Sequence, residues 1–210
     1  MNKRRAFIKT GLTAAAALAV KPFSSLALPR PSGKVTKPIV LSTWNSGIRA
    51  NEEAWKILSA GGRSLDAVEK GVMVIESDPE ERSVGYGGRP DRDGRVTLDA
   101  CIMDEYANIG SVACLEHIKN PICVARAVME KTPHVMLVGD GALQFALSQG
   151  FKKENLLTEK SEKEWREWLK TSDYHPVINI ENHDTIGMIA LDANGNLSGS
   201  CTTSGMAWKM

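Results

Sequence analysis

The chain is predicted to adopt a layered α/β fold. Segments rich in β-branched residues alternate with segments whose apolar residues recur at helical spacing, which indicates helices before and between strands. The last two strand-like segments are separated by Asp192-Ala193-Asn194-Gly195, and an Asn-Gly pair is a strong hairpin signal. These patterns predict the class of fold and leave the order of the strands open.

The first elements are a strand at residues 38–43 and a helix at residues 52–60, the latter from its apolar spacing. Ser64 is expected to cap a second helix that ends at Asp78-Pro79. Asn120 is the expected cap of a later helix, because asparagine before proline is typical of a helix start. The remaining elements are strands at 96–103, 109–114 and 135–138, a turn at 139–141 that leads into a helix, a charged and solvated helix at 162–169, and a hairpin of residues 185–191 and 196–203.

Residues 1–27 are typical of an export signal. A basic region that contains Arg4-Arg5 precedes an apolar run at residues 12–20 and a small-residue exit. The run is shorter than the roughly 20 apolar residues that cross a bilayer. Paired arginines before Phe-Ile-Lys favour the twin-arginine route. We therefore expect a periplasmic or secreted protein that has no membrane contact once the signal is removed, with residues 28–37 as a linker to the domain.

Composition excludes several classes of function. Removing residues 1–27 takes away five basic residues and no acidic one, so the formal net charge changes from +1 to −4. No basic patch with interleaved aromatic residues is present, so nucleic-acid binding is not expected. The four cysteines are widely spaced and have no nearby histidine cluster, so no metal site is expected. Cys101 and Cys114 lie on strand-like segments and are expected to be buried free cysteines.

The segment from His183 to Met188 lies where a polar stretch gives way to a predicted strand. A threonine hydroxyl is a weak nucleophile unless a base lies beside it, and an N-terminal threonine supplies its own α-amino group as that base. This amine has an unperturbed pKa of about 7.7–8.0, which suits proton transfer near neutral pH. Because Thr185 is internal, the chemistry requires cleavage of the Asp184–Thr185 bond. The alternative is an ordinary strand threonine.

Five ordered blocks together resemble the glycosylasparaginase family, N4-(β-N-acetylglucosaminyl)-L-asparaginases that belong to the N-terminal nucleophile hydrolases. The resemblance extends from about Pro38 to Met210. The blocks are Trp44-Asn45-Ser46-Gly47, Ser83-Val84-Gly85-Tyr86-Gly87-Gly88-Arg89-Pro90-Asp91, Val96-Thr97-Leu98-Asp99-Ala100-Cys101-Ile102-Met103-Asp104, His183-Asp184-Thr185-Ile186-Gly187-Met188 and Cys201-Thr202-Thr203-Ser204-Gly205.

The resemblance implies an αββα sandwich, two stacked sheets between helical layers, in which Thr185 opens a central strand. It divides the domain into an α-subunit-like part, residues 38–184, and a β-subunit-like part, residues 185–210. Family members continue beyond the position of Met210, with an arginine and an aspartate that hold the substrate and a Thr-Gly pair that forms the oxyanion hole. We therefore expect the sandwich to be incomplete at the C-terminus of this chain.

The resemblance also assigns roles at the cleavage site. Thr185 is the nucleophile and, after cleavage, the base. Asp184 assists self-cleavage, with a loop carboxylate as the alternative. Our own interpretation, which the resemblance does not supply, is that His183 shapes the scissile loop, with a solvated loop histidine as the alternative.

Three residues outside the cleavage site complete the expected set. Trp44 is implied in substrate binding, against the alternative of a core tryptophan. Ser83 is expected to make a contact near the nucleophile, and Thr203 is expected to orient it from across the hairpin. Ordinary loop and strand residues are the alternatives for these two. Residues 85–88 lack the Gly-Lys-Ser/Thr ending of a phosphate loop, so their glycines are expected to let the backbone approach a pocket.

The implied activity is a self-cleaving amidohydrolase that needs no cofactor. Its substrate is N4-(β-N-acetylglucosaminyl)-L-asparagine, which it converts to aspartate and the glucosaminyl amine, and its two parts form an α/β heterodimer, with a dimer of such heterodimers left open. The related isoaspartyl peptidase and asparaginase branch is the first alternative, although Trp44-Asn45 favours glycosylasparaginase because that branch has His-Gly-Gly there. An inactive, uncleaved and truncated product is the second alternative.

Overall fold

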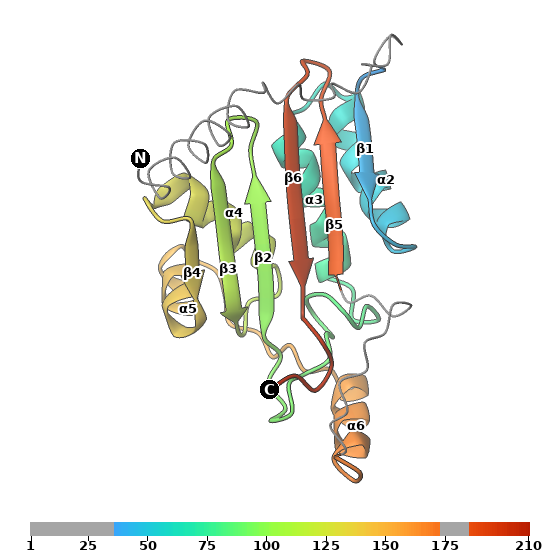
Figure 1. Cartoon of the computed structure of the whole chain (residues 1–210), viewed down its shortest axis with the longest axis vertical. Coiled ribbons are helices and arrows are strands. Elements are labelled where there is room, and N and C mark those ends of the chain that lie inside the picture. Colours follow the sequence, from blue (N-terminus) through green and yellow to red (C-terminus); the bar gives the residue numbers. More distant parts are fainter. Residues whose placement is uncertain (1–35, 173–184) are drawn as a thin grey trace, which may run out of the picture. The chain divides into compact units, whose positions relative to one another are not determined.

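The computed structural model describes residues 36–172 and 185–210, and its strands form one mixed sheet (Figure 1). The strand order is β1-β5-β6-β2-β3-β4. All neighbouring strands are antiparallel except β3 and β4, which are parallel. The strands are β1 (Ile39–Ser42), β2 (Leu98–Met103), β3 (Ile109–Leu115), β4 (Met136–Val138), β5 (Thr185–Leu191) and β6 (Leu197–Thr203).

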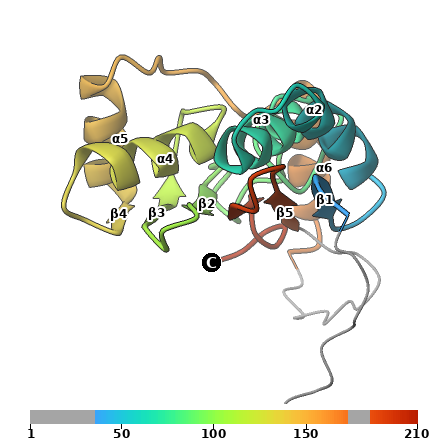
Figure 2. The same ribbon diagram turned by 90° about the horizontal axis from the view of Figure 1, so that it is seen from above.

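Helices cover one face of this sheet, as Figure 2 shows from above. They are α2 (Gly47–Ser59), α3 (Ser64–Glu76), α4 (Pro121–Lys131) and α5 (Gly139–Ser148). A further helix, α6 (Glu159–Trp168), contacts the loop before β2 instead: its Ser161 Oγ donates to the Gly87 carbonyl at 2.7 Å. Among the described residues, no helix is long and apolar enough to cross a bilayer.

The core forms between the helices and the inner face of the sheet. In β5 the buried side chains alternate, Ile186, Met188 and Ala190, as expected for a strand with one covered face. Gly71 lets α3 approach closely, because a Cβ there would lie 2.6 Å from the Met188 sulfur and 2.9 Å from the Ala50 carbonyl oxygen. The buried apolar residues of α3 thus pack directly on the central hairpin.

The buried face of β6 is polar, and α3 satisfies its hydroxyl groups. Ser198 Oγ lies 2.9 Å from Ser64 Oγ, and Ser200 Oγ donates to the Val68 carbonyl at 3.1 Å. Thr202 Oγ1 donates to the Glu76 carboxylate at 2.7 Å. Buried polar groups cost little when they are hydrogen-bonded. These contacts fix α3 along the length of β6.

The structure confirms the layered α/β class and corrects several local predictions. The described residues build one sheet and one helical layer of the four-layer arrangement that the family resemblance implies. The second helix of the sequence is not capped by Ser64, which is instead its first helical residue. The first helix begins at Gly47, directly after the turn that follows β1, and not at residue 52 as predicted. Residues 139–141 form the first turn of α5 and are not a separate turn.

Two other helix starts were closer to expectation. Asn120 does precede the first helical residue of α4, Pro121, but its side chain makes no cap and donates instead to Met73 O and Ser77 Oγ at the end of α3. The charged helix α6 begins at Glu159, and its Thr158 cap accepts a hydrogen bond from Ser161 N. The predicted leader, residues 1–27, lies outside the described residues.

Asp192 joins the hairpin turn to the start of α3. Its buried carboxylate accepts hydrogen bonds from the backbone N–H groups of Asn194 and Asn196, both at 2.9 Å, and from Ser64 N at 3.3 Å. Burial alone raises the pKa of this carboxyl group, but the hydrogen bonds outweigh burial and hold the pKa below its usual range. The negative charge also lies at the N-terminus of α3, where the helix dipole stabilises it.

We predict that Asp192→Ala lowers the free energy of unfolding by about 1–3 kcal/mol at pH 7, because several buried N–H donors lose their acceptor. The folded-state pKa is depressed, so this contribution is present above the unfolded pKa of about 4 and is lost as pH falls below it. Urea unfolding at pH 7 and at pH 3 measures the difference. Asp93→Ala, at an exposed carboxylate in another turn, is the control. An equal loss at both pH values would contradict the assignment.

Candidate active site

Three polar side chains lie in one row at one end of the three central strands β5, β6 and β2. Thr185 on β5 is directly opposite Thr203 on β6, and Thr203 is directly opposite Asp99 on β2. All three point to the face away from the helices, because Ile186 after Thr185 is buried, as are the neighbours on both sides of Thr203 and of Asp99. Neighbouring strands lie about 4.7–4.9 Å apart, so the Thr203 hydroxyl is within reach of Thr185. The expected proximity of these two threonines is present.

Trp44 lies against the backbone of Thr185. Its indole Nε1 donates a 2.7 Å hydrogen bond to the Thr185 carbonyl oxygen. The connection after β1 places it there: Thr43 exchanges hydrogen bonds with the backbone of Gly187 at 3.0 Å, which extends the pairing of β1 with β5. Trp44 itself has φ of 62°, a conformation that is rare outside glycine. A half-exposed tryptophan is thereby held at the start of β5 and is not part of the core.

Ser83 reaches this end of the sheet through its backbone. Its carbonyl oxygen accepts the Ser204 N–H at 2.7 Å, one residue after Thr203, while its hydroxyl donates to Glu81 at 2.9 Å. The Thr203 hydroxyl accepts the Gly205 N–H at 2.9 Å, which orients it at the end of β6. The contact of Ser83 with Thr185 stays a prediction. His183 and Asp184 lie outside the described residues.

The glycines between Ser83 and Pro90 bring this loop close to α3 and β6. Gly85 has φ of 59°, and a Cβ on it would lie 2.2 Å from the Glu76 carbonyl oxygen. A Cβ on Gly88 would lie 2.6 Å from the Ser204 Cβ. Larger residues would therefore push the loop away from the end of β6. This agrees with the interpretation that the glycines allow close backbone approach beside the row.

Asp99 is a candidate functional residue that the sequence analysis did not single out. Its carboxylate accepts the Cys114 N–H at 2.7 Å where β2 and β3 shift register, and Cys114 has φ of 52°. Leu98 and Ala100 on either side of it are buried, so the Asp99 side chain points to the outer face of the sheet. The pairing of β2 with β6 is what brings it to Thr203, and strand order was not available from the sequence.

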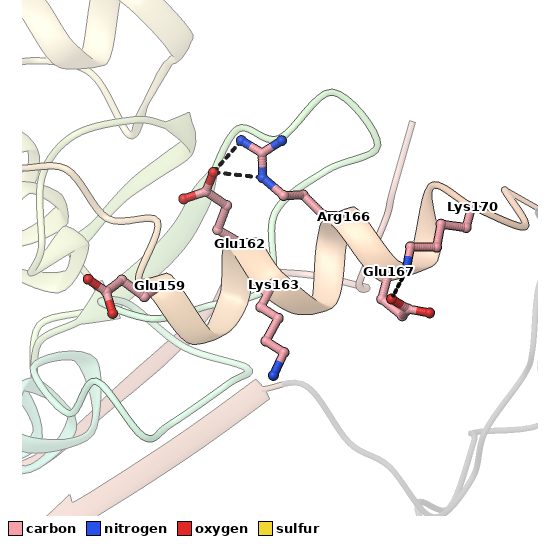
Figure 3. Close-up of a pocket in the computed structure, with 6 residues that line it drawn as sticks. All are labelled: Glu159, Glu162, Lys163, Arg166, Glu167 and Lys170. Atoms are coloured by element: carbon pink, nitrogen blue, oxygen red, sulfur yellow. Dashed lines mark hydrogen bonds and ion pairs between the residues drawn. The ribbon is translucent and has the colours of Figure 1, made fainter.

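Two hollows lie on the surface of the described residues, one far along the chain at α6 and one beside the threonine row. One runs along α6 and is lined by that helix and by Lys170 just beyond its end. The charged side chains there pair with one another, as Figure 3 shows for Arg166 with Glu162. It has the solvated character predicted for this segment. The second is a shallow apolar groove of about 580 Å³ on the outer face of the sheet, next to the threonine row. Its lining includes Leu41, Cys101, Met103, Gly187, Ile189 and Cys201.

Within the described part of the chain, no group of three or more histidine, cysteine or acidic side chains is placed to hold a metal ion. On the inner face of β6, Glu76 accepts a hydrogen bond from the Thr202 hydroxyl and is fully buried. Burial raises its pKa to about 8, although hydrogen bonds from Thr202, Asn120 and the Ile122 N–H oppose that rise. The Glu76 carboxyl group is bound to Thr202, the residue before Thr203, on the opposite face of β6.

The chain is thus a layered α/β protein in which a central strand begins at a threonine, opposite a second threonine that is itself opposite a carboxylate. The family model described as asparaginase matches residues 42–210, about four fifths of the chain, including the threonine row, Trp44 and Ser83. The chain belongs to this asparaginase family.

Curated relatives agree with the family assignment. An Elizabethkingia miricola protein named N(4)-(β-N-acetylglucosaminyl)-L-asparaginase is 76% identical over this whole chain and 62% of its own length. A rat protein of the same name is 38% identical over 88% of this chain and 62% of its own length. A Drosophila melanogaster protein named as a putative enzyme of this kind is 38% identical over 82% of this chain and 54% of its own length. The chain spans less than two thirds of each.

We predict that Trp44→Phe slows the cleavage expected before Thr185 by about 2- to 10-fold. The substitution keeps an aromatic ring but removes the donor to the Thr185 carbonyl, and one hydrogen bond contributes about 0.5–1.5 kcal/mol. The time course of fragment formation, followed by intact mass, measures the rate. Trp55→Phe is the matched control, since Trp55 is equally exposed, at 46% against 48%, and lies on α2. Equal rates in both variants would contradict a role for the indole N–H.

Glu76 gives a second prediction, for stability. The folded-state pKa of about 8 lies above the model-compound value of 4.5, so between these values the folded chain binds more protons than the unfolded chain. The free energy of unfolding should therefore fall as pH rises from about 4.5 to 8. Glu76→Gln should remove most of this slope, as measured by urea unfolding across the range. Glu80→Gln, at an exposed carboxylate, should leave it unchanged.

Proposed function

We propose that this chain is part of a self-cleaving amidohydrolase that acts on asparagine glycosylated at its side-chain amide. The observation that carries the proposal is the position of Thr185. It opens a central strand, opposite Thr203, with its carbonyl oxygen held by Trp44. The printed names of the curated relatives support the substrate class.

Maturation is proposed to begin with attack of the Thr185 hydroxyl on the Asp184 carbonyl carbon. The peptide nitrogen leaves as the α-amine of Thr185, and an ester forms by an N-to-O shift. Water then hydrolyses the ester, which leaves a carboxylate on Asp184 and a free N-terminal threonine. Trp44 supports this step because its hydrogen bond holds the carbonyl group on the far side of Thr185 in place. Asp184 is proposed to assist by activating the hydroxyl group.

In the substrate reaction the new α-amino group acts as the base and the Thr185 hydroxyl as the nucleophile. Attack on the side-chain amide carbon of the substrate forms an aspartyl ester and releases the glucosaminyl amine. Water then releases aspartate and regenerates the hydroxyl group. The Thr203 hydroxyl, held by the Gly205 N–H, is proposed to orient the nucleophile. Base and nucleophile lie in one residue, so the proposed reaction uses no cofactor.

We further propose that the two parts stay together as a heterodimer in the periplasm or outside the cell. The proposal of export rests on the basic and apolar pattern of residues 1–27. The proposal of a heterodimer rests on the sheet itself. β5 and β6 follow the cleavage point, yet they pair with β1 on one side and β2 on the other. Cleavage before Thr185 therefore leaves both ladders intact.

The isoaspartyl peptidase branch remains the second candidate because it shares the threonine chemistry. Trp44 at the start of β5 favours glycosylated asparagine, since the resemblance to that branch would place His-Gly-Gly here. Release of aspartate from glycosylated asparagine and from a β-aspartyl dipeptide, measured side by side, decides between them. A cleaved protein that releases aspartate only from the dipeptide would overturn the proposed substrate.

We predict that the purified protein, incubated at neutral pH, separates under reducing and denaturing conditions into two masses that meet between Asp184 and Thr185. Thr185→Ala should remain a single mass, because it lacks the hydroxyl that attacks the bond. Thr171→Ala, which removes an exposed hydroxyl at the end of α6, should be cleaved at the wild-type rate. A wild-type chain that stays whole would contradict the proposal and support the inactive, uncleaved alternative. Cleavage in Thr185→Ala would exclude this residue as the attacking group.

A further inference from the structure

We propose that Glu76 is a positioning residue of the candidate active site. Its side chain holds the end of β6, which carries Thr203, and its main chain holds the loop that carries Ser83. Glu76 is the last residue of α3 and is fully buried on the inner face of the sheet. It therefore acts through other groups and does not touch the reacting atoms. The inference rests on the proposed function, because the reaction that it affects is the cleavage before Thr185.

The carboxyl group of Glu76 joins the ends of three elements. One oxygen accepts the Thr202 hydroxyl at 2.7 Å and the Ile122 N–H at 3.1 Å, and the other accepts the Asn120 side-chain amide at 3.2 Å. Ile122 lies in the first turn of α4, where backbone N–H groups have no partner within the helix. Glu76 thus ties the end of α3 and the start of α4 to the end of β6.

The main chain of the same residue anchors the loop of residues 83–88. The carbonyl oxygen of Glu76 accepts the Tyr86 N–H at 2.7 Å. Gly85 makes this approach possible, because a Cβ there would lie 2.2 Å from that oxygen and 2.5 Å from the Glu76 Cα. The loop therefore lies against the end of α3 at a separation that admits no side chain.

Together these contacts form a closed ring of hydrogen bonds and chain. The ring leaves the Glu76 side chain at Thr202 and follows β6 to Ser204. There the Ser204 N–H donates to the Ser83 carbonyl oxygen at 2.7 Å, and the loop leads back through Tyr86 to α3. The residue between Thr202 and Ser204 is the second threonine of the polar row. Both expected partners of the nucleophile therefore belong to this ring.

The bond between Glu76 and Thr202 is the link that a substitution can test. The other two hydrogen bonds of the ring join backbone groups, which a change of side chain leaves in place. Without the carboxyl group, the Thr202 hydroxyl and the Ile122 N–H lose a buried acceptor, and the end of β6 is free to shift relative to the loop. A misplacement of about 1 Å costs on the order of 100-fold in rate even when its source is remote from the chemistry.

Glutamine is the conservative substitution at this position. Burial raises the pKa of Glu76 to about 8, and the like charge of Glu69 on the same helix acts in the same direction, so the carboxyl group is neutral at pH 7. A glutamine side chain is neutral as well and keeps a carbonyl oxygen that can accept the Thr202 hydroxyl and the Ile122 N–H. It should therefore keep the ring closed.

The test measures the rate of the proposed cleavage before Thr185 at pH 7 by intact mass. We expect Glu76→Ala to slow cleavage by about 10- to 100-fold, and Glu76→Gln to stay within about 3-fold of the wild type. Thr202→Val removes the same link from the other side while keeping a β-branched side chain, and should slow cleavage by about 2- to 10-fold.

Asp104→Ala is the matched control for lost stability. Its carboxylate is also buried, and it accepts the Tyr106 and Asn108 N–H groups, each at 2.9 Å, in the turn between β2 and β3. This turn follows the end of β2 away from Asp99, so cleavage should keep the wild-type rate wherever the variant is folded.

A Glu76→Ala chain that is cleaved as fast as Asp104→Ala would overturn the proposal. A Glu76→Gln chain as slow as Glu76→Ala would overturn it too, because the link would then require more than an acceptor. Should Glu76→Ala fail to fold, Thr202→Val decides: slowed cleavage supports the proposal, and the wild-type rate contradicts it.

Amide hydrogen exchange in a Thr185→Ala background separates this proposal from the proposed function, because that chain reports the ring without the reaction. Adding Glu76→Ala should speed exchange of the Ser204 N–H about 10-fold more than adding Asp104→Ala does, and Glu76→Gln should not. Equal exchange in the Glu76→Ala and Asp104→Ala chains would overturn the ring. A wild-type chain that stays whole while Ser204 responds as expected would support the ring and contradict the proposed cleavage.

Discussion

The register of the β5–β6 hairpin is the constraint on which the rest of the structure depends. The hairpin is the last pair of strands in the chain, yet it fills the centre of the sheet and separates β1 from β2. Thr185 begins it and Thr203 ends it, so their alignment is set by the turn at the far end. A slip of one residue would exchange the inner and outer faces of the strands. Such a slip would bury Thr185 and expose Ile186, so the core and the candidate site are specified together.

The helix α3 enforces that register through polar contacts that only one alignment satisfies. Asp192 in the turn binds the first N–H of α3, and Glu76 at the other end of the helix accepts the Thr202 hydroxyl. Between them, Ser198 and Ser200 find partners on the same helix. A shift of two residues, which keeps the same face of the hairpin inward, would leave these hydroxyl groups buried without their partners, at about 1–3 kcal/mol each. Apolar side chains alone would specify the alignment less strictly, because they tolerate small displacements.

The sequence predicted the elements well because their signals are local. The Asn-Gly turn, the β-branched runs and the helical spacing each depend on a few neighbouring residues, and all of the strands they indicated are present. Strand order is not local, so the neighbours of Thr203 across β2 remained unknown, and Asp99 was not singled out. The same limit explains Ser64: a serine at a helix start predicts a cap, but the carboxylate that binds this helix N-terminus is Asp192, more than a hundred residues away.

The cysteines show a related limit. A cysteine on an apolar strand is most often buried, and that general preference predicted Cys101 to be a buried free cysteine, whereas it is exposed in this structure. Burial depends on what covers each face of the sheet, and the described helices cover one face only. Alternation along β2 separates the two faces correctly, with Ala100 and Ile102 on one and Cys101 and Met103 on the other. It does not say which of the two faces is covered.

The proposed cleavage point, at the start of a central strand, would reconcile two demands that otherwise conflict. A new N-terminus must be free enough to act as a base, while its hydroxyl must stay fixed relative to its partners. Placed on a long loop, a cut end would lose its position as soon as the bond broke. Thr185 instead begins a strand that is paired on both sides, and Ile186 and Met188 anchor it in the core. Separating the proposed fragments would require breaking both ladders and exposing that apolar surface, so the hydroxyl would keep its place once the proposed cleavage freed the amine.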